Sequence, residues 1–135
     1  MYQLPEQLKK TTYVIAEFEL STLLLMNDKR FPWVMLVPRR KDVRDLIDLL
    51  PGEQAVLLDE INRVAVFVKR YFKAQNLNIA ALGNVLPILH VHIIARFNTD
   101  AAWPNAVWGM GQAVPYSDDE AQKIIANMQK ALSPR

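Results

Sequence analysis

NVLPILHVHIIAR, residues 84–96, holds both histidines of the chain within a run of β-forming residues that favours a strand. Because side chains alternate between the two faces of a strand, His90 and His92 would share one face. The same face would carry Ile88, Ile94 and Arg96. Histidine changes charge near neutral pH, so two adjacent imidazoles can attack, move protons or bind a metal. Two unrelated histidines in a buried strand are the plainer alternative.

The composition is that of a globular protein, with 135 residues, 51% hydrophobic and 22% charged. We expect one domain over residues 1–135. A net charge of +2 is too small to indicate a nucleic-acid surface, and the absence of cysteine excludes disulfides and thiolate metal sites. No apolar run approaches the roughly 20 residues of a membrane helix, and the first residues do not look like a signal peptide. We therefore expect a cytoplasmic protein with no nucleic-acid or membrane partner.

Strand and helix patterns lie on both sides of the histidine stretch. We expect a short polar helix over 4–11, strands over 12–19, 21–26 and 33–37, a turn or two of helix within 42–50, a helix from 52 to about 75, a strand over 76–82 and a helix from 117 to about 132. Ser117 is a capping residue for the last helix, and the acidic residues after it suit the positive end of the helix dipole. These elements predict an α+β domain with an antiparallel sheet of about five strands, one long helix and a C-terminal helix.

The histidine stretch resembles the signature of the histidine triad (HIT) family of nucleotide hydrolases and transferases. The family pattern is His-φ-His-φ-His-φ-φ, where φ is an apolar residue. Ile88 stands in the place of the first histidine, His90 is the middle one and His92 is the last. The chain therefore resembles a divergent branch of the family.

The resemblance extends over most of the chain. It includes residues 24–28 and 33–38, which look like the two strands before the family's long helix, and Trp103-Pro104 and Trp108-Gly109, which look like its C-terminal tail. It implies a HIT-like fold and a homodimer built from the strand over 76–82 and the long helix.

The resemblance also implies a reaction, the cleavage of a nucleotide at its α-phosphate. His90 would attack the phosphorus and form a nucleotidyl-imidazole intermediate, while His92 would neutralise the phosphoryl oxygens or assist the leaving group. In the family, the backbone carbonyl of the first triad residue fixes the tautomer of the middle histidine, and a backbone group survives the change to Ile88. We expect a dinucleoside polyphosphate, a phosphoramidate or an adenylylated substrate. No cofactor is required, apart from a divalent metal that the substrate can bring with it.

Four further residues are candidate substrate ligands. The amide of Asn84 could donate to phosphate, and Asn27 matches a family position that contacts the ribose hydroxyls. A turn-forming asparagine is the alternative for both. Arg96 could steer an anion, or it could be an exposed arginine at a strand end. Trp108 matches a tail tryptophan near the site, or it packs into a dimer seam.

The isoleucine at position 88 leaves two other functions open. Ile88 cannot donate a proton, and it desolvates the imidazoles beside it, which lowers their pKa and leaves His92 a weaker source of protons. A nucleotide-binding module without turnover is therefore one alternative. A metal-dependent hydrolase with His90 and His92 as ligands is another. A zinc site needs a third protein ligand, which here would have to be Asp or Glu.

Overall fold

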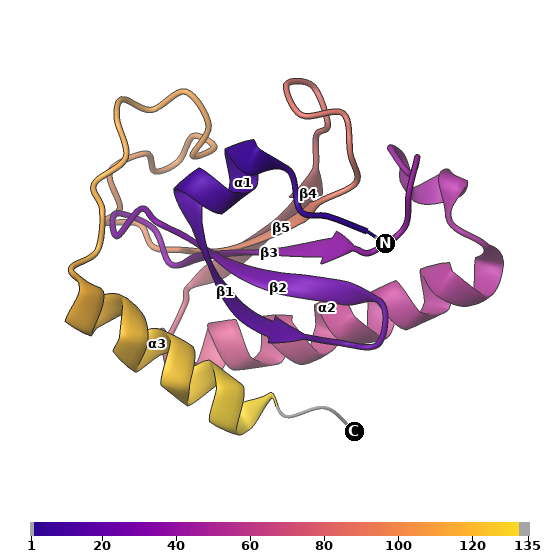
Figure 1. The fold of residues 1–135 in the computed structure, drawn as a ribbon. Coiled ribbons are helices and arrows are strands. Elements are labelled where there is room, and N and C mark those ends of the chain that lie inside the picture. Colours follow the sequence, from indigo (N-terminus) through magenta and orange to yellow (C-terminus); the bar gives the residue numbers. More distant parts are fainter. Residues whose placement is uncertain (1, 133–135) are drawn as a thin grey trace.

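The computed structural model describes residues 2–132, and its centre is a five-stranded antiparallel sheet (Figure 1). The strands are β1 (Thr12–Glu17), β2 (Ser21–Met26), β3 (Trp33–Pro38), β4 (Asn76–Ala81) and β5 (Val91–Arg96). Their order in the sheet is β1-β2-β3-β5-β4, so β5 lies between β3 and β4, and β1 and β4 form the two edges. The first three strands are a meander of neighbours, because short turns join antiparallel strands. The expected α+β class and strand number are confirmed.

The helices divide between the two faces of the sheet. They are α1 (Glu6–Thr11), the 3-10 turn η1 (Leu46–Asp48), α2 (Pro51–Tyr71) and α3 (Asp118–Ala131). Figure 1 shows α2 and α3 on one face, and α1 with the segments over 82–90 and 97–116 on the other. Within residues 2–132, no helix is both long and apolar enough to cross a membrane.

Each face of the sheet has its own apolar core. The helix α2 places Leu57, Val64 and Val68 on one face, where they join the main cluster of buried side chains. The second cluster lies on the other face and includes Trp33 and Ile94. Since both faces are covered, every residue of β3 and β5 is buried. This burial is why β3 reads as a continuous apolar run instead of an alternating one.

Local interactions set the start of α3 and the end of α2. The N-cap of α3 is the predicted Ser117, whose Oγ accepts from the backbone N–H of Glu120 at 3.1 Å, and whose own N–H donates to the Glu120 carboxylate at 2.9 Å. The helix α2 ends at Tyr71, earlier than the expected position 75. Lys73 has a φ of 55°, and a left-handed residue of this kind terminates a helix.

The histidine strand is shorter than expected, which corrects one prediction. It begins at Val91, so Ile88 and His90 lie in the irregular segment before it. Pro87 has no N–H for a sheet ladder, and Gly83 turns the chain with a φ of 65°. The shared face holds only from His92 onward. His90 reaches the same side of the molecule through a loop.

Candidate functional site

His90 is held by the backbone just before it. Its Nδ1 lies 2.8 Å from the carbonyl oxygen of Ile88, and the side chain is buried. A carbonyl oxygen only accepts hydrogen bonds, so Nδ1 carries the hydrogen and Nε2 carries the lone pair. The backbone acceptor expected at position 88 is therefore present. The Nε2 of His90 is therefore a ring nitrogen with a free lone pair.

His92 lies on β5, with its ring centroid 4.9 Å from that of His90 and the two planes at 64°. Its Nδ1 accepts a hydrogen bond of 3.0 Å from the indole N–H of Trp33. Burial, and in second place the charge of the neighbouring His90, lower the pKa of His92 to about 4. His92 is thus neutral at pH 7, and a neutral imidazole is a poor proton donor. The predicted direction of its pKa is confirmed.

A cavity of about 390 Å³ opens beside the two imidazoles. Its lining comes from α1, the end of β2, β3, the segment after β4, β5 and the tail. The residues are Gln7, Leu8, Thr11, Met26, Trp33, Met35, Leu82, Gly83, Asn84, Val85, Leu86, His90, His92 and Trp108. No Lys, Arg, Asp or Glu is among these residues. The cavity is mostly apolar, with a few polar side chains, as is usual for small-molecule sites.

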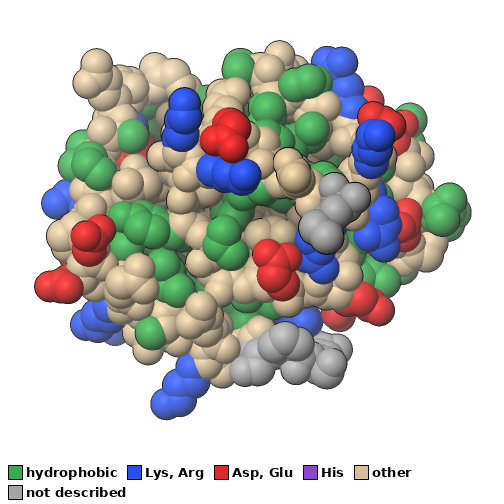
Figure 2. Space-filling model, viewed as in Figure 1, with side chains coloured by type: hydrophobic (Ala, Val, Ile, Leu, Met, Phe, Trp, Pro, Cys, Tyr) green, Lys and Arg blue, Asp and Glu red, His purple; other side chains and the backbone are tan. Residues whose placement is uncertain are grey.

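Neither imidazole is visible on the face of the molecule drawn in Figure 2, where acidic and basic side chains are mixed. This agrees with exposed fractions of 8% for His90 and 5% for His92. A reactant must therefore enter the cavity to reach either ring.

Trp108 brings the tail to the site. Its ring meets His92 edge-on, with centroids 5.1 Å apart at 80°, and Trp33 in the same way at 6.1 Å and 88°. The three rings form one wall of the cavity, and edge-to-face contacts of this kind favour a defined arrangement. Trp108 therefore lies beside His92, as the resemblance implies.

The two candidate asparagines lie in different places. Asn84 is exposed and lines the cavity. Asn27 is not among the lining residues; its side-chain oxygen accepts from the backbone N–H of Tyr116 at 2.9 Å. Asn27 therefore fastens the segment before α3 to the turn after β2. Its neighbour Met26, the last residue of β2, lines the cavity.

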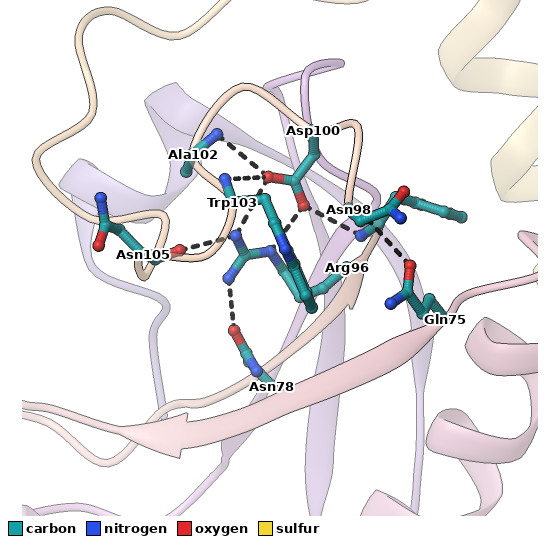
Figure 3. Close-up of polar contacts among 9 residues, drawn as sticks. Gln75, Asn78, Arg96, Asn98, Asp100, Ala102, Trp103 and Asn105 are labelled. Atoms are coloured by element: carbon teal, nitrogen blue, oxygen red, sulfur yellow. Dashed lines mark hydrogen bonds and ion pairs between the residues drawn. The ribbon is translucent and has the colours of Figure 1, made fainter.

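Arg96 is 2% exposed, so the expected exposed position at the strand end is wrong. Figure 3 shows its guanidinium surrounded by protein partners. Nε and Nη2 bond the carboxylate of Asp100 at 2.8 and 3.1 Å, Nη2 also donates to the Asn105 carbonyl at 2.7 Å, and Nη1 donates to the Asn78 side chain at 2.6 Å. Because every guanidinium nitrogen is engaged in this way, Arg96 holds the tail in place. It does not line the cavity.

Ile88 is partly buried and packs against the apolar cluster that includes Trp33 and Ile94. The side chain has no polar atom to offer the site, which agrees with the sequence. Within residues 2–132, no group of three or more His, Asp or Glu residues is arranged to hold a metal ion. His90 and His92 therefore have no third protein ligand beside them in this part of the chain.

Several residues of the site were missed by sequence reasoning. Trp33 was predicted only as the start of a strand, whereas its indole bonds His92. Gln7 and Thr11 were predicted only as part of a polar helix, and they line the cavity. The alternation of β3 would have placed Trp33 and Met35 on one face. Nothing in the sequence indicated that this face would be the one shared with His92.

The comparisons with known proteins agree with this geometry. The family model described as HIT domain matches residues 7–99, more than half of the chain. Histidine triad proteins of Bradyrhizobium japonicum, Sinorhizobium meliloti and Marinobacter aquaeolei are 45%, 40% and 39% identical, each with a TM-score of 0.94. These matches cover 96%, 96% and 98% of this chain, and 97%, 96% and 96% of the other chains. Among the curated proteins, none matches.

Proposed function

The chain belongs to the histidine triad (HIT) family of nucleotide-binding hydrolases and transferases, and from this membership we propose that it cleaves nucleotides through a covalent intermediate on His90. One observation carries the proposal: the Nδ1 of His90 lies 2.8 Å from the Ile88 carbonyl. This contact leaves the Nε2 lone pair free for attack even though position 88 has no imidazole.

The reaction has two displacements. In the first, the Nε2 lone pair of His90 forms a bond to the α-phosphorus, and the bond from phosphorus to the leaving group breaks, with the electron pair going to the leaving group. The ring becomes positively charged, and the Ile88 carbonyl stabilises it through the hydrogen on Nδ1. In the second, water attacks phosphorus, the N–P bond breaks, and its electron pair returns to Nε2. The water loses its proton, and the protonated leaving group and a nucleoside monophosphate are released.

The charge of the cavity favours one class of substrate. No cationic side chain is among the described residues that line it. A polyphosphate chain would bring several negative charges without a positive partner, and buried unpaired charge is costly. A nucleoside phosphoramidate carries a single negative charge on its phosphoryl group, and so does an adenylylated acid. Neutral hydrogen-bond donors are enough to stabilise that single charge, so we propose these two kinds of substrate.

The remaining lining residues suit the rest of such a molecule. We assign the Asn84 amide, which lies at the cavity and is exposed, to the phosphoryl oxygens. Trp108 and the apolar side chains of Met26 and Leu86 form a wall on which a nucleobase can pack. His92 donates to the phosphoryl group as a neutral ring, since its pKa is about 4.

A nucleotide-binding module without turnover is the second candidate. The observation that favours it is the apolar side chain of Ile88, which packs into a cluster and offers no proton to a leaving group. Such a protein would bind a nucleotide in the cavity without cleaving it. Its signature would be tight binding of a nucleotide together with an unmodified His90.

We propose further that the protein is a homodimer, assembled through α2 and β4. The strand β4 is an edge of the sheet, and Ile79 on it is 47% exposed. On α2, Leu58 and Val66 are 58% and 49% exposed. An open edge beside exposed apolar side chains is a surface that a second copy can cover.

The test is a panel of substrates assayed in the presence of EDTA. It contains an adenosine phosphoramidate, an aminoacyl adenylate analogue and a dinucleoside polyphosphate, and the readout is released mononucleotide. We expect release from the first two, a mass increase of one nucleotidyl group in a quenched reaction, and loss of both with His90→Ala while nucleotide binding survives. His92→Asn is the matched variant, which should slow the reaction and keep the mass increase. A His90→Ala protein within about tenfold of the parent would overturn the covalent route.

A further inference from the structure

The hydrogen bond between Trp33 and His92 joins two strands that line the cavity. Trp33 starts β3 and pairs in register with Ile94, so its indole reaches His92 diagonally along β5. The indole N–H lies 3.0 Å from Nδ1, the ring centroids are 5.7 Å apart, and Trp33 is only 7% exposed. The contact is therefore a buried and directional one.

This bond decides where the hydrogen of His92 sits. An indole nitrogen can only donate, so the Nδ1 that it meets must be without hydrogen, and a neutral ring then carries its hydrogen on Nε2. His90 has the opposite arrangement, because the Ile88 carbonyl can only accept. The two rings thus differ at Nε2, which is a lone pair on His90 and an N–H on His92.

We propose that Trp33 is a positioning residue of the site, which holds His92 as the tautomer that donates from Nε2. The inference rests on the proposed function. A phosphoryl group beside the rings meets one lone pair, which attacks, and one N–H, which donates to an oxygen. With the other tautomer, His92 would turn a second lone pair toward the anion and repel it.

Few groups other than Trp33 can influence this ring. Its partner across β3 is Met35, its partner across β4 is Ala80, and the tail contributes Trp108. His90 is the titratable group that faces it, since no Asp, Glu, Lys or Arg is among the described residues that line the cavity. A proton on Nδ1 would point at the indole N–H, so the tryptophan also opposes the charged form.

The first experiment reads both tautomers in the unaltered protein. Long-range ¹H–¹⁵N correlation spectra distinguish a protonated from an unprotonated ring nitrogen, and the chain has only two histidines, which His90→Ala assigns. At pH 7 we expect hydrogen on Nδ1 of His90 and on Nε2 of His92. A spectrum with the His92 hydrogen on Nδ1 would overturn the proposal, whether or not any variant folds.

The second experiment compares Trp33→Phe with Trp108→Phe by the same spectra over a pH series. Both changes keep an aromatic ring against His92, but only the first removes a hydrogen bond to it. Trp33→Phe should populate both tautomers of His92 and raise its pKa, because the indole N–H no longer opposes a proton on Nδ1. Trp108→Phe should leave the tautomer in place. A folded Trp33→Phe protein with the parent's tautomer and pKa would contradict the role.

The third arm measures kcat and KM on the best substrate of the panel. We expect Trp33→Phe to lower kcat by about tenfold or more, with a smaller change in KM. The reason is that the Nε2–H of His92 stabilises the negative charge that develops in the transition state, and the variant no longer holds that N–H in place. An altered tautomer with an unchanged kcat would overturn the positioning role. If the unaltered protein turns over none of the substrates, the proposed function fails, and the two sets of spectra still decide what Trp33 does to His92.

Discussion

Ile88 meets His90 through its backbone, while its side chain belongs to the apolar cluster beneath the cavity. The two parts of this residue can therefore be separated experimentally. Any residue at position 88 offers the carbonyl that orients His90. Only some side chains offer a proton as well. The orientation of His90 therefore does not depend on which side chain stands at position 88.

Ile88→His should raise kcat/KM on the best substrate by tenfold at most. A positioned acid–base group is typically worth roughly 10²–10⁴-fold, and one that the surrounding residues do not support delivers less. The change should also lower the free energy of unfolding by about 1–3 kcal/mol, because a polar ring replaces an apolar contact. Ile88→Val is the control, with no gain in rate. A folded Ile88→His protein no faster than the parent would mean that the site needs no donor there.

The lowered pKa of His92 makes the stability of the fold depend on pH. Between about pH 4 and 6.5, the folded protein leaves His92 neutral and the unfolded chain binds a proton there. The free energy of unfolding should therefore fall as pH drops through this window, by on the order of 3 kcal/mol at most. Urea titrations of the protein and of His92→Asn check this, since asparagine can still accept from Trp33.

The comparison is cleanest between pH 4.5 and 6.5. The carboxyl groups with lowered pKa values, such as Asp28 and Glu53, have ordinary values of 3.8 and 4.5, so their contribution is lost only at lower pH. The His92→Asn protein should show a flatter dependence in this window. Parallel curves for the two proteins would mean that His92 titrates alike in the folded and unfolded states.

At the scale of elements, the segment after β5 is held by one carboxylate. Asp100 accepts from the Arg96 guanidinium and from the backbone N–H groups of Phe97, Ala102 and Trp103. These bonds hold the pKa of Asp100 at about 2, against the opposing effect of its burial. Trp108 lies a few residues further on, so this loop fixes the start of the segment that carries it to His92.

Asp100→Ala should lower the free energy of unfolding by about 3–5 kcal/mol, because it leaves a buried guanidinium without its charge partner. It should also speed amide exchange across residues 97–108 and weaken substrate binding more than it lowers kcat. Denaturant titration and hydrogen exchange measure the first two effects. Asp119→Ala, in the exposed first turn of α3, is the control and should cost less than about 1 kcal/mol. Equal costs for the two variants would contradict the assigned role of Asp100.

On the scale of the whole molecule, the sheet is covered on both faces and open at its edges. The edge β1 packs with α3, while β4 is half-exposed along its length. The apolar side chains on β4 and the outer face of α2 are those of the proposed dimer. The helix α1 and the segment over 82–90, which contribute to the lining of the cavity, lie on the other face of the sheet from α2 (Figure 1). Assembly through α2 and β4 therefore leaves the cavity wall formed by α1 and Trp108 uncovered.

Light scattering at low micromolar concentration should give about twice the 15.5 kDa of the single chain. Val66→Asp, on the exposed face of α2, should shift the protein to monomer, because an interface tolerates an unpaired buried charge poorly. Val14→Asp is the matched control, since Val14 is 54% exposed on the opposite edge strand. A monomeric parent, or a Val14→Asp protein that dissociates in the same way, would contradict the assembly.

Much of the fold follows from patterns that are local in the chain. The strand over 21–26 and the capping box at Ser117 were predictable because alternation, helical spacing and end-capping involve residues only a few positions apart. The two histidines were visible as a pair for the same reason. The carbonyl that orients His90 was expected from the family resemblance, and it belongs to the residue two positions earlier. The predicted start of the histidine strand was wrong because Pro87, which lacks an N–H for the sheet, lies within an apolar run that otherwise favours a strand.

The state of His92 and the place of Arg96 depended on contacts between distant parts of the chain. Trp33 and His92 are 59 positions apart, and only the pairing of β3 with β5 brings the indole to the imidazole. Arg96 was predictable as a strand residue. Its burial depends on how the tail folds back to supply Asp100 and Asn105. The alternation of side chains along a strand does not predict that folding. The sequence thus determines which groups are present, while packing determines which nitrogen of each ring carries a hydrogen and which charges face the cavity.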